Sequence, residues 1–105
     1  IDNVIQMNIL AMSTDNKKAL NQVYNTAVGD RTTLVELVTF LKKLLSNFDQ
    51  KIKDVKIIHG PNRNGDIPHS LASIEKAKKL LKYEPTHDIK TGLKESVNWY
   101  FKNLK

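Results

Sequence analysis

The stretch TLVELVTFLKKLLSNF, residues 33–48, carries the clearest structural pattern in the chain. Thr33 and Glu36 have the spacing of a capping box, in which each side chain accepts a hydrogen bond from the backbone amide of the other residue. Beyond them, apolar residues recur every three or four positions: Leu34, Leu37, Val38, Leu41, Leu44, Leu45 and Phe48. The stretch therefore predicts an amphipathic helix with one buried face.

Three more amphipathic helices are predicted before and after this stretch. Residues 2–12 begin with Asp2, which can cap the first turn, and their apolar face consists of Ile5, Ile9 and Met12. Ser73 can cap a second helix, whose inward positions are Ile74, Ala77, Leu80 and Leu81. The last helix begins at Asp88, and its apolar side consists of Ile89, Leu93, Val97, Tyr100, Phe101 and Leu104.

Two short segments have the composition of β-strands. Residues 22–28 (QVYNTAV) and 55–58 (VKII) are rich in β-branched and aromatic side chains, and a glycine follows each closely. Residues 59–70 (HGPNRNGDIPHS) contain two glycines, two prolines and two asparagines, which is typical of an irregular loop. We therefore predict an α/β fold, helix-rich with short strands, in a single domain that spans residues 1–105.

Charge and composition narrow the possible partners and sites. The 105 residues carry a net charge of +6, and the whole surplus of bases lies in residues 51–105, which favours an anionic partner. The chain has no cysteine, so it has neither disulfides nor thiolate zinc ligands, and its three histidines lack metal-ligand spacing. We expect no metal site. Without a visible signal peptide or an apolar run of about 20 residues, we expect a cytoplasmic protein that does not bind membranes.

The loop at residues 59–70 is the best candidate for a binding site. Arg63 is one of only two arginines, and its planar guanidinium is suited to two oxygens of a diphosphate. Asp66 lies three residues later and can accept hydrogen bonds from sugar hydroxyls. The alternative is a surface turn with a local ion pair. The chain has neither a GxGxxG cofactor loop nor a tyrosine followed four residues later by lysine, so we expect no catalytic residue in it.

Several segments in order resemble nucleotide-sugar epimerases, which are extended short-chain dehydrogenases/reductases. They are IDNVIQMN (1–8), QVYNTAVGDRTTLVEL (22–37), RNGDIPHSLA (63–72) and SIEKAKKLLKYEP (73–85), followed by Gly92-Leu93 and Trp99-Tyr100. The resemblance covers almost all of the chain and identifies it as the C-terminal, substrate-binding part of such an enzyme. Within the family it is most similar to the UDP-N-acetylglucosamine 4-epimerases.

The resemblance implies an isomerase of polysaccharide biosynthesis that inverts the sugar C4 through a 4-keto intermediate with NAD. The NAD site and the catalytic residues belong to an N-terminal Rossmann domain, which is absent here, so the fragment alone is expected to be inactive. The implied role of Arg63 is contact with the UDP diphosphate, and that of Asp66 is contact with the ribose. Ser70 corresponds to the position beside the sugar, where a small residue leaves room for an acetamido group. The full-length protein is expected to be a homodimer.

Three residues depart from the family pattern: Pro68 replaces an arginine, Ser73 an aspartate and Lys82 a glycine. The lysine is expected to adopt a left-handed conformation at a cost of about 1 kcal/mol. One alternative is the same domain of a UDP-glucose or UDP-glucuronate epimerase. Another is a basic helical module that binds nucleic acid through Lys76, Lys78, Lys79 and Lys82, or an interaction domain. We expect no nucleic-acid partner, because the chain has few arginines and no aromatics interleaved with its bases.

Overall fold

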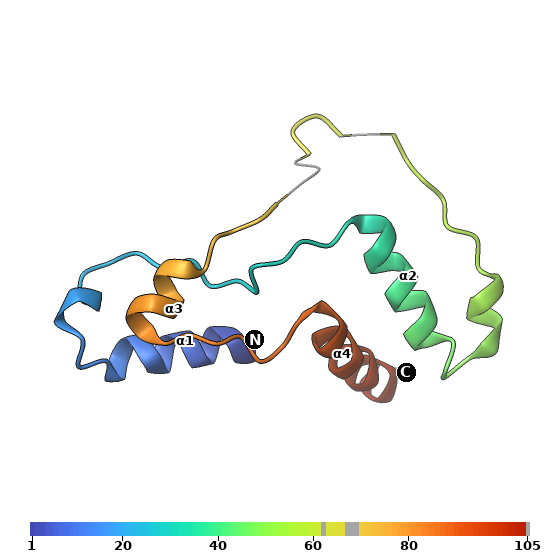
Figure 1. Ribbon diagram of the computed structural model, residues 1–105. Helices are drawn as coiled ribbons and strands as arrows, with labels where there is room; N and C mark the ends of the chain where they lie inside the picture. The colour runs from blue at the N-terminus through green and yellow to red at the C-terminus, as the bar shows by residue number, and fades with distance from the viewer. Residues whose placement is uncertain (62, 67–69, 105) are drawn as a thin grey trace. The chain divides into compact units, whose positions relative to one another are not determined.

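The computed structural model describes residues 1–61, 63–66 and 70–104, and its regular elements are all helical (Figure 1). In chain order they are α1 (Asp2–Ser13), the 3₁₀ helix η1 (Lys17–Ala19), α2 (Leu34–Leu45), the 3₁₀ helix η2 (Gln50–Asp54), α3 (Glu75–Leu81) and α4 (Ile89–Asn103). They form two compact units. Unit 1 consists of Ile1–Arg31 and Leu71–Asp88, and unit 2 of Thr32–Ser70 and Ile89–Lys105.

The predicted α/β fold is wrong, because none of the described residues forms a β-strand. Residues 22–28 are irregular chain in unit 1, where side chains satisfy two of their carbonyls: Lys76 Nζ donates to Val23 over 3.0 Å and the Tyr83 hydroxyl to Ala27 over 2.8 Å. Residues 55–58 are irregular and exposed. β-Branched residues favour extended backbone, but a strand also needs a neighbouring strand to pair with it.

The helix predicted over residues 33–48 begins where it was expected, after the cap at Thr33, but it ends earlier, at Leu45. The Thr33 hydroxyl accepts from the Glu36 amide over 3.2 Å, and the Glu36 carboxylate accepts from the Thr33 amide over 2.8 Å. The resulting α2 ends at Leu45 and packs against η2 and α4 in unit 2. Phe48 lies beyond the helix and stacks on Phe101 of α4, with ring centroids 4.3 Å apart.

The other two predicted caps are not formed as expected. Ile1 is the N-cap of α1, and Asp2 lies inside the first turn, where its charge still favours the positive end of the helix dipole. Ile74 is the N-cap of α3. Ser73 precedes it, and its hydroxyl lies 3.5 Å from the Glu75 amide, which is a weak hydrogen bond.

The core of unit 1 is formed where α1, η1 and α3 pack together (Figure 1). Its buried residues are Met7, Ala19, Ile74, Ala77, Leu81 and Tyr83. Tyr83 is completely buried. Gly29 has a φ of +79° and approaches the core so closely that an added Cβ would lie 3.2 Å from the Ile74 side chain. This close approach and the positive φ both favour glycine at position 29.

Polar side chains of α1 hold the segment that follows α3. Asn3 donates from its amide nitrogen to the His87 carbonyl over 2.8 Å, and its oxygen accepts from the amides of Thr86 and His87. Gln6 accepts from the Glu84 amide over 3.1 Å. These hydrogen bonds satisfy backbone groups that have no partner in a helix or strand. They fix the path of residues 84–87 although this segment has no regular secondary structure.

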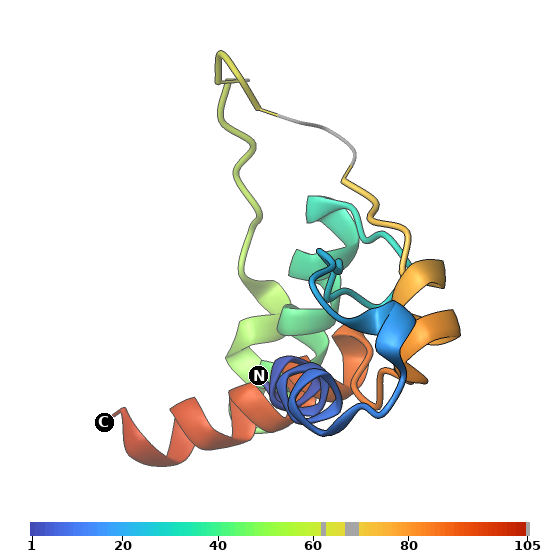
Figure 2. The ribbon, with the colours of Figure 1, turned by 90° about the vertical axis from the view of Figure 1, so that its left-hand side faces the viewer.

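In unit 2, α4 forms over the predicted residues but buries little of its apolar side. Val97 is its only buried residue in the described part of the chain, and Tyr100 and Phe101, predicted to face inward, remain about half exposed beside Trp99. Figure 2 shows α4 from a second direction. Over the described residues, no helix has both the length and the apolar character needed to cross a membrane.

The left-handed conformation predicted for Lys82 is confirmed. The residue ends α3 with φ +59° and ψ +33°, and its amide donates to the Lys78 carbonyl over 3.1 Å. A lysine Cβ is crowded by the backbone in this conformation, whereas glycine has no Cβ. The turn directs the next residue, Tyr83, into the core.

We expect Lys82→Gly to raise the free energy of unfolding by about 0.5–1 kcal/mol, because relief of this strain exceeds the added entropy of the unfolded chain. Urea titration followed by circular dichroism measures the change. Lys79→Gly is the matched control, since Lys79 is exposed inside the same helix and its replacement should lower stability by about 0.5–1 kcal/mol. Equal losses in both variants would contradict the strain at Lys82.

Burial raises the pKa of the Tyr83 hydroxyl above its ordinary value of 10.0. The folded protein therefore holds this proton more tightly than the unfolded chain, and the resulting stability is fully present below pH 10 and lost as the pH rises through the raised value. We expect the free energy of unfolding, measured by urea titration, to decrease between pH 9 and pH 11 in the unaltered protein. The decrease should be smaller in Tyr83→Phe, which lacks the hydroxyl. At pH 8 the same variant should be less stable by about 0.5–1.5 kcal/mol, the usual contribution of one hydrogen bond. Parallel pH profiles would contradict this role.

Candidate functional site

Arg63 and Asp66 lie together on one tight turn of unit 2. The Asp66 amide donates to the Arg63 carbonyl over 3.2 Å, which closes a four-residue turn. Gly65 occupies it with a φ of +88°, a conformation that side-chain-bearing residues rarely adopt. The sequence motif Arg-x-Gly-Asp thus has a local structural cause, because glycine permits the turn that brings its two charged ends close together.

Both charged side chains of this turn are exposed and available. Among the described residues, neither the Arg63 guanidinium nor the Asp66 carboxylate takes part in an ion pair or a side-chain hydrogen bond. The local ion pair considered as an alternative from the sequence is therefore not observed in the described part. A guanidinium in this state can donate to two oxygens of a diphosphate without first breaking a protein contact.

Ser70, the third predicted site residue, is exposed and follows the same loop. Pro68 and His69 lie outside the described residues, so the described structure does not connect Ser70 to the turn at Arg63. The three predicted site residues share unit 2 and one irregular segment. Among the described residues, none of these three side chains has a partner that would activate it as a nucleophile or general base.

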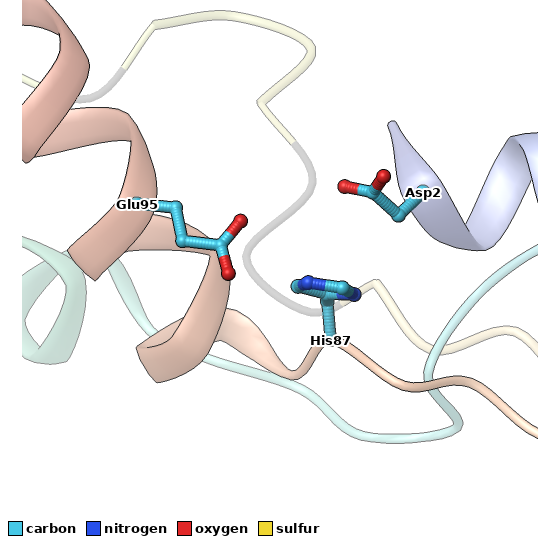
Figure 3. A group of neighbouring side chains, drawn as sticks. All are labelled: Asp2, His87 and Glu95. Carbon is cyan, nitrogen blue, oxygen red and sulfur yellow. The ribbon is translucent and has the colours of Figure 1, made fainter.

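In unit 1, Asp2 and His87 lie close together, which the spacing of the histidines in the sequence did not predict. The Asp2 carboxylate and the His87 imidazole offer ligand-type atoms within 4.8 Å of each other (Figure 3). His87 Nδ1 also lies 2.8 Å from the Thr86 hydroxyl. Protein zinc sites use three or four ligands, so this pair by itself is not a metal centre. Glu95, drawn in the same figure, belongs to unit 2.

A hollow of about 390 Å³ lies at the end of α3 in unit 1. It is lined by Lys78, Lys82, Tyr83, Glu84 and Pro85. None of the three predicted site residues contributes to it. Its two lysines belong to the four that the nucleic-acid alternative invokes, and Glu84 follows shortly after the turn at Lys82. The hollow therefore follows from the end of the helix rather than from a recognisable motif.

Comparison with known proteins shows that the chain is similar in sequence to part of several UDP-sugar 4-epimerases. The chain is 39% identical over 82 residues to UDP-glucuronate 4-epimerase 5 of Arabidopsis thaliana, an alignment that covers 78% of the chain and 18% of that protein. UDP-glucuronate 4-epimerase 4 of the same plant is 32% identical over 110 residues, with 95% of the chain and 24% of the relative covered. The chain is thus similar to a region of nucleotide-sugar epimerases.

This epimerase-like region spans about a fifth of the length of the curated relatives that it matches. UDP-glucose 4-epimerase 4 of Oryza sativa subsp. japonica is more distant, at 28% identity over 82 residues, or 78% of the chain and 21% of that protein. No protein-family model matches the chain. The expected resemblance to nucleotide-sugar epimerases is thus confirmed, and the names of these three relatives specify UDP-glucuronate and UDP-glucose rather than UDP-N-acetylglucosamine.

Proposed function

We propose that the chain is the UDP-sugar-binding part of an NAD-dependent UDP-sugar 4-epimerase. The observation that carries this proposal is the turn at Arg63 and Asp66, with both charged side chains unengaged among the described residues, in a chain similar to UDP-glucuronate 4-epimerases. The enzyme would invert the sugar C4 through a 4-keto intermediate. The chain would supply affinity and orientation for the nucleotide end of the substrate.

In this proposal Arg63 binds the diphosphate and Asp66 binds the ribose. The guanidinium donates in parallel to two phosphate oxygens, and the carboxylate accepts from sugar hydroxyls. Gly65 keeps the two groups at the ends of one turn, so the nucleotide is held at two adjacent points. Such two-point binding orients a substrate better than one flexible charge, because it restricts rotation about the contact.

NAD chemistry would come from another part of the protein. The chain has no GxGxxG loop and no tyrosine followed four residues later by lysine, so NAD and the catalytic pair belong to a Rossmann domain outside residues 1–105. Bound there, NAD would supply reversible hydride-transfer chemistry at the sugar C4. The chain by itself would be inactive. The complete enzyme would be a cytoplasmic homodimer without nucleic-acid or membrane partners.

Two sugars have support from different observations. UDP-glucuronate is our first candidate, because it is the substrate named for the Arabidopsis relatives at 39% and 32% identity. UDP-N-acetylglucosamine is the second, because Ser70 is small and exposed and would leave space for an acetamido group. The two substrates differ at C2 and C6, so a substitution at Ser70 distinguishes them.

The nucleic-acid alternative is weakened by the contacts of the α3 lysines. Lys76 donates to the Val23 carbonyl and lies 5.2 Å from the centre of the Tyr24 ring. Lys78 forms an ion pair with Glu75. Of these four lysines, Lys76 therefore has its ammonium group held by neutral groups of unit 1, and Lys78 has its charge partly offset by an acid, so neither is a free cation for a phosphate backbone.

In the complete enzyme, Arg63→Ala should raise KM for the UDP-sugar about 10- to 100-fold, roughly the 1.5–3 kcal/mol of a charge-assisted contact. Arg63→Lys should recover only part of this affinity, because an ammonium cannot donate in the same planar fork. Steady-state kinetics measure both. Arg31→Ala, which removes the other arginine, is the matched control and should leave KM unchanged. Unaltered KM values in both Arg63 variants would remove Arg63 from the site.

Ser70→Tyr should lower kcat/KM for UDP-N-acetylglucosamine more than for UDP-glucuronate, by about 5- to 150-fold, the effect of overfilling a packed site by 1–3 kcal/mol. The ratio of the two kcat/KM values is the measurement, since a loss of stability lowers both together. Ser70→Ala serves as the control and should keep the ratio. A ratio that is also unchanged in Ser70→Tyr would place this residue away from the sugar.

A further inference from the structure

Residues 55–58, Val-Lys-Ile-Ile, are exposed although three of the four side chains are branched and apolar. The exposed fractions are 56% for Val55, 42% for Ile57 and 90% for Ile58. In Figures 1 and 2 this segment runs onward from η2 as extended chain, and none of the described segments of unit 2 runs beside it. Water thus contacts side chains that are typical of the interior of a sheet.

The start of the segment is fixed, and its remaining backbone is not paired. The Val55 amide donates to the Ile52 carbonyl over 3.3 Å, and Lys42 Nζ of α2 donates to the Val55 carbonyl over 2.6 Å. For Lys56, Ile57 and Ile58, the described structure contains no hydrogen bond to a main-chain amide or carbonyl. Anchored extended backbone with free donors and acceptors is the state of an edge strand that lacks its neighbour.

We propose that residues 55–58 become a β-strand by pairing with a strand from a part of the epimerase polypeptide outside residues 1–105. The chain spans about a fifth of its relatives' length, so proteins of that size contain ample chain to supply a neighbour. Alternate residues of a strand direct their amides and carbonyls to the same edge, and both backbone groups of Val55 are already bonded within unit 2. Pairing on the other edge would satisfy the amides of Lys56 and Ile58 and would shield the branched side chains beside them. It also explains why a strand-like sequence is not a strand here.

A second copy of the chain is a less suitable partner strand for residues 55–58, because its lysines would repel those of the first copy. Lys56 lies within the segment and Lys53 just before it. Two antiparallel copies paired through the edge of Lys56 and Ile58 would place the two Lys56 side chains opposite or diagonal to each other on one face, and like charges directly across a strand pair are destabilising. Lysine on an exposed edge is also a common means of preventing such self-pairing. The neighbouring strand is therefore expected to be uncharged or acidic.

Hydrogen exchange tests the proposal on residues 1–105 alone and on the complete product of the reading frame that encodes them. The amides of Lys56 and Ile58 should exchange at the unprotected rate in the chain alone, and at least about 100-fold more slowly in the complete product. Absence of protection in the complete product would overturn the proposal. Protection in the chain alone that grows with protein concentration would overturn it too, because a second copy would then be the occupant.

Ile58→Pro and Ile58→Val form a matched pair. Proline removes the amide that would join the strand ladder and keeps the preceding residue extended, whereas valine retains both the amide and the branched side chain. In the chain alone, neither variant should change the unfolding temperature, since the Ile58 amide has no partner among the described residues. In the complete product, only Ile58→Pro should lower it and abolish the protection. Equal unfolding temperatures of both variants in the complete product would contradict the pairing.

The inference rests on the proposed function only for the source of the neighbouring strand. Arg63→Ala separates the two, because it should weaken UDP-sugar binding while the amides of Lys56 and Ile58 stay protected. Loss of the epimerase assignment would appear as a complete product that binds no UDP-sugar but still protects these amides. Failure of the strand pairing would appear as intact substrate binding without protection.

Discussion

Tyr83 is completely buried in unit 1, and its hydroxyl is tolerated there because the Ala27 carbonyl accepts a hydrogen bond from it. The residue enters the core because Lys82 adopts a left-handed conformation and turns the chain at the end of α3. Residues 22–28 and α3 are thereby joined, and α1 packs against α3 and holds the following segment through Asn3. The strain at Lys82 is thus compensated by the burial of the next side chain.

The candidate site does not depend on burial, since Arg63, Asp66 and Ser70 are all exposed. The turn at residues 63–66 depends on one backbone hydrogen bond and on the positive φ of Gly65, and its charged side chains remain in water. Exposed charges gain little from one another because water screens them. A diphosphate would bring a double negative charge and several acceptors to Arg63, so the ligand rather than the protein completes the electrostatics of the site.

Local interactions were the part of the fold that could be predicted. The capping box of Thr33 and Glu36 was predicted from the spacing of two neighbouring residues. The left-handed Lys82 was predicted from the resemblance, because the lysine replaces a glycine of the family pattern at the end of the helix. The caps expected from Asp2 and Ser73 failed by one residue, since several neighbouring positions can begin a helix at similar cost. The inward face of α4 was also mispredicted: periodicity identifies an apolar side, but it does not supply the surface that covers it.

The sequence by itself determined the helical segments, the Arg-x-Gly-Asp turn and the resemblance to nucleotide-sugar epimerases, because these reside in short patterns of neighbouring residues. Only the tertiary structure decided that residues 22–28 and 55–58 are not strands. A strand is stabilised by a partner distant in sequence, and β-branched composition does not report whether that partner is present. For residues 22–28, side chains from α3 and Tyr83 take the place of a neighbouring strand. For residues 55–58 the described part of the chain provides no such replacement, so the same composition leaves the backbone unpaired.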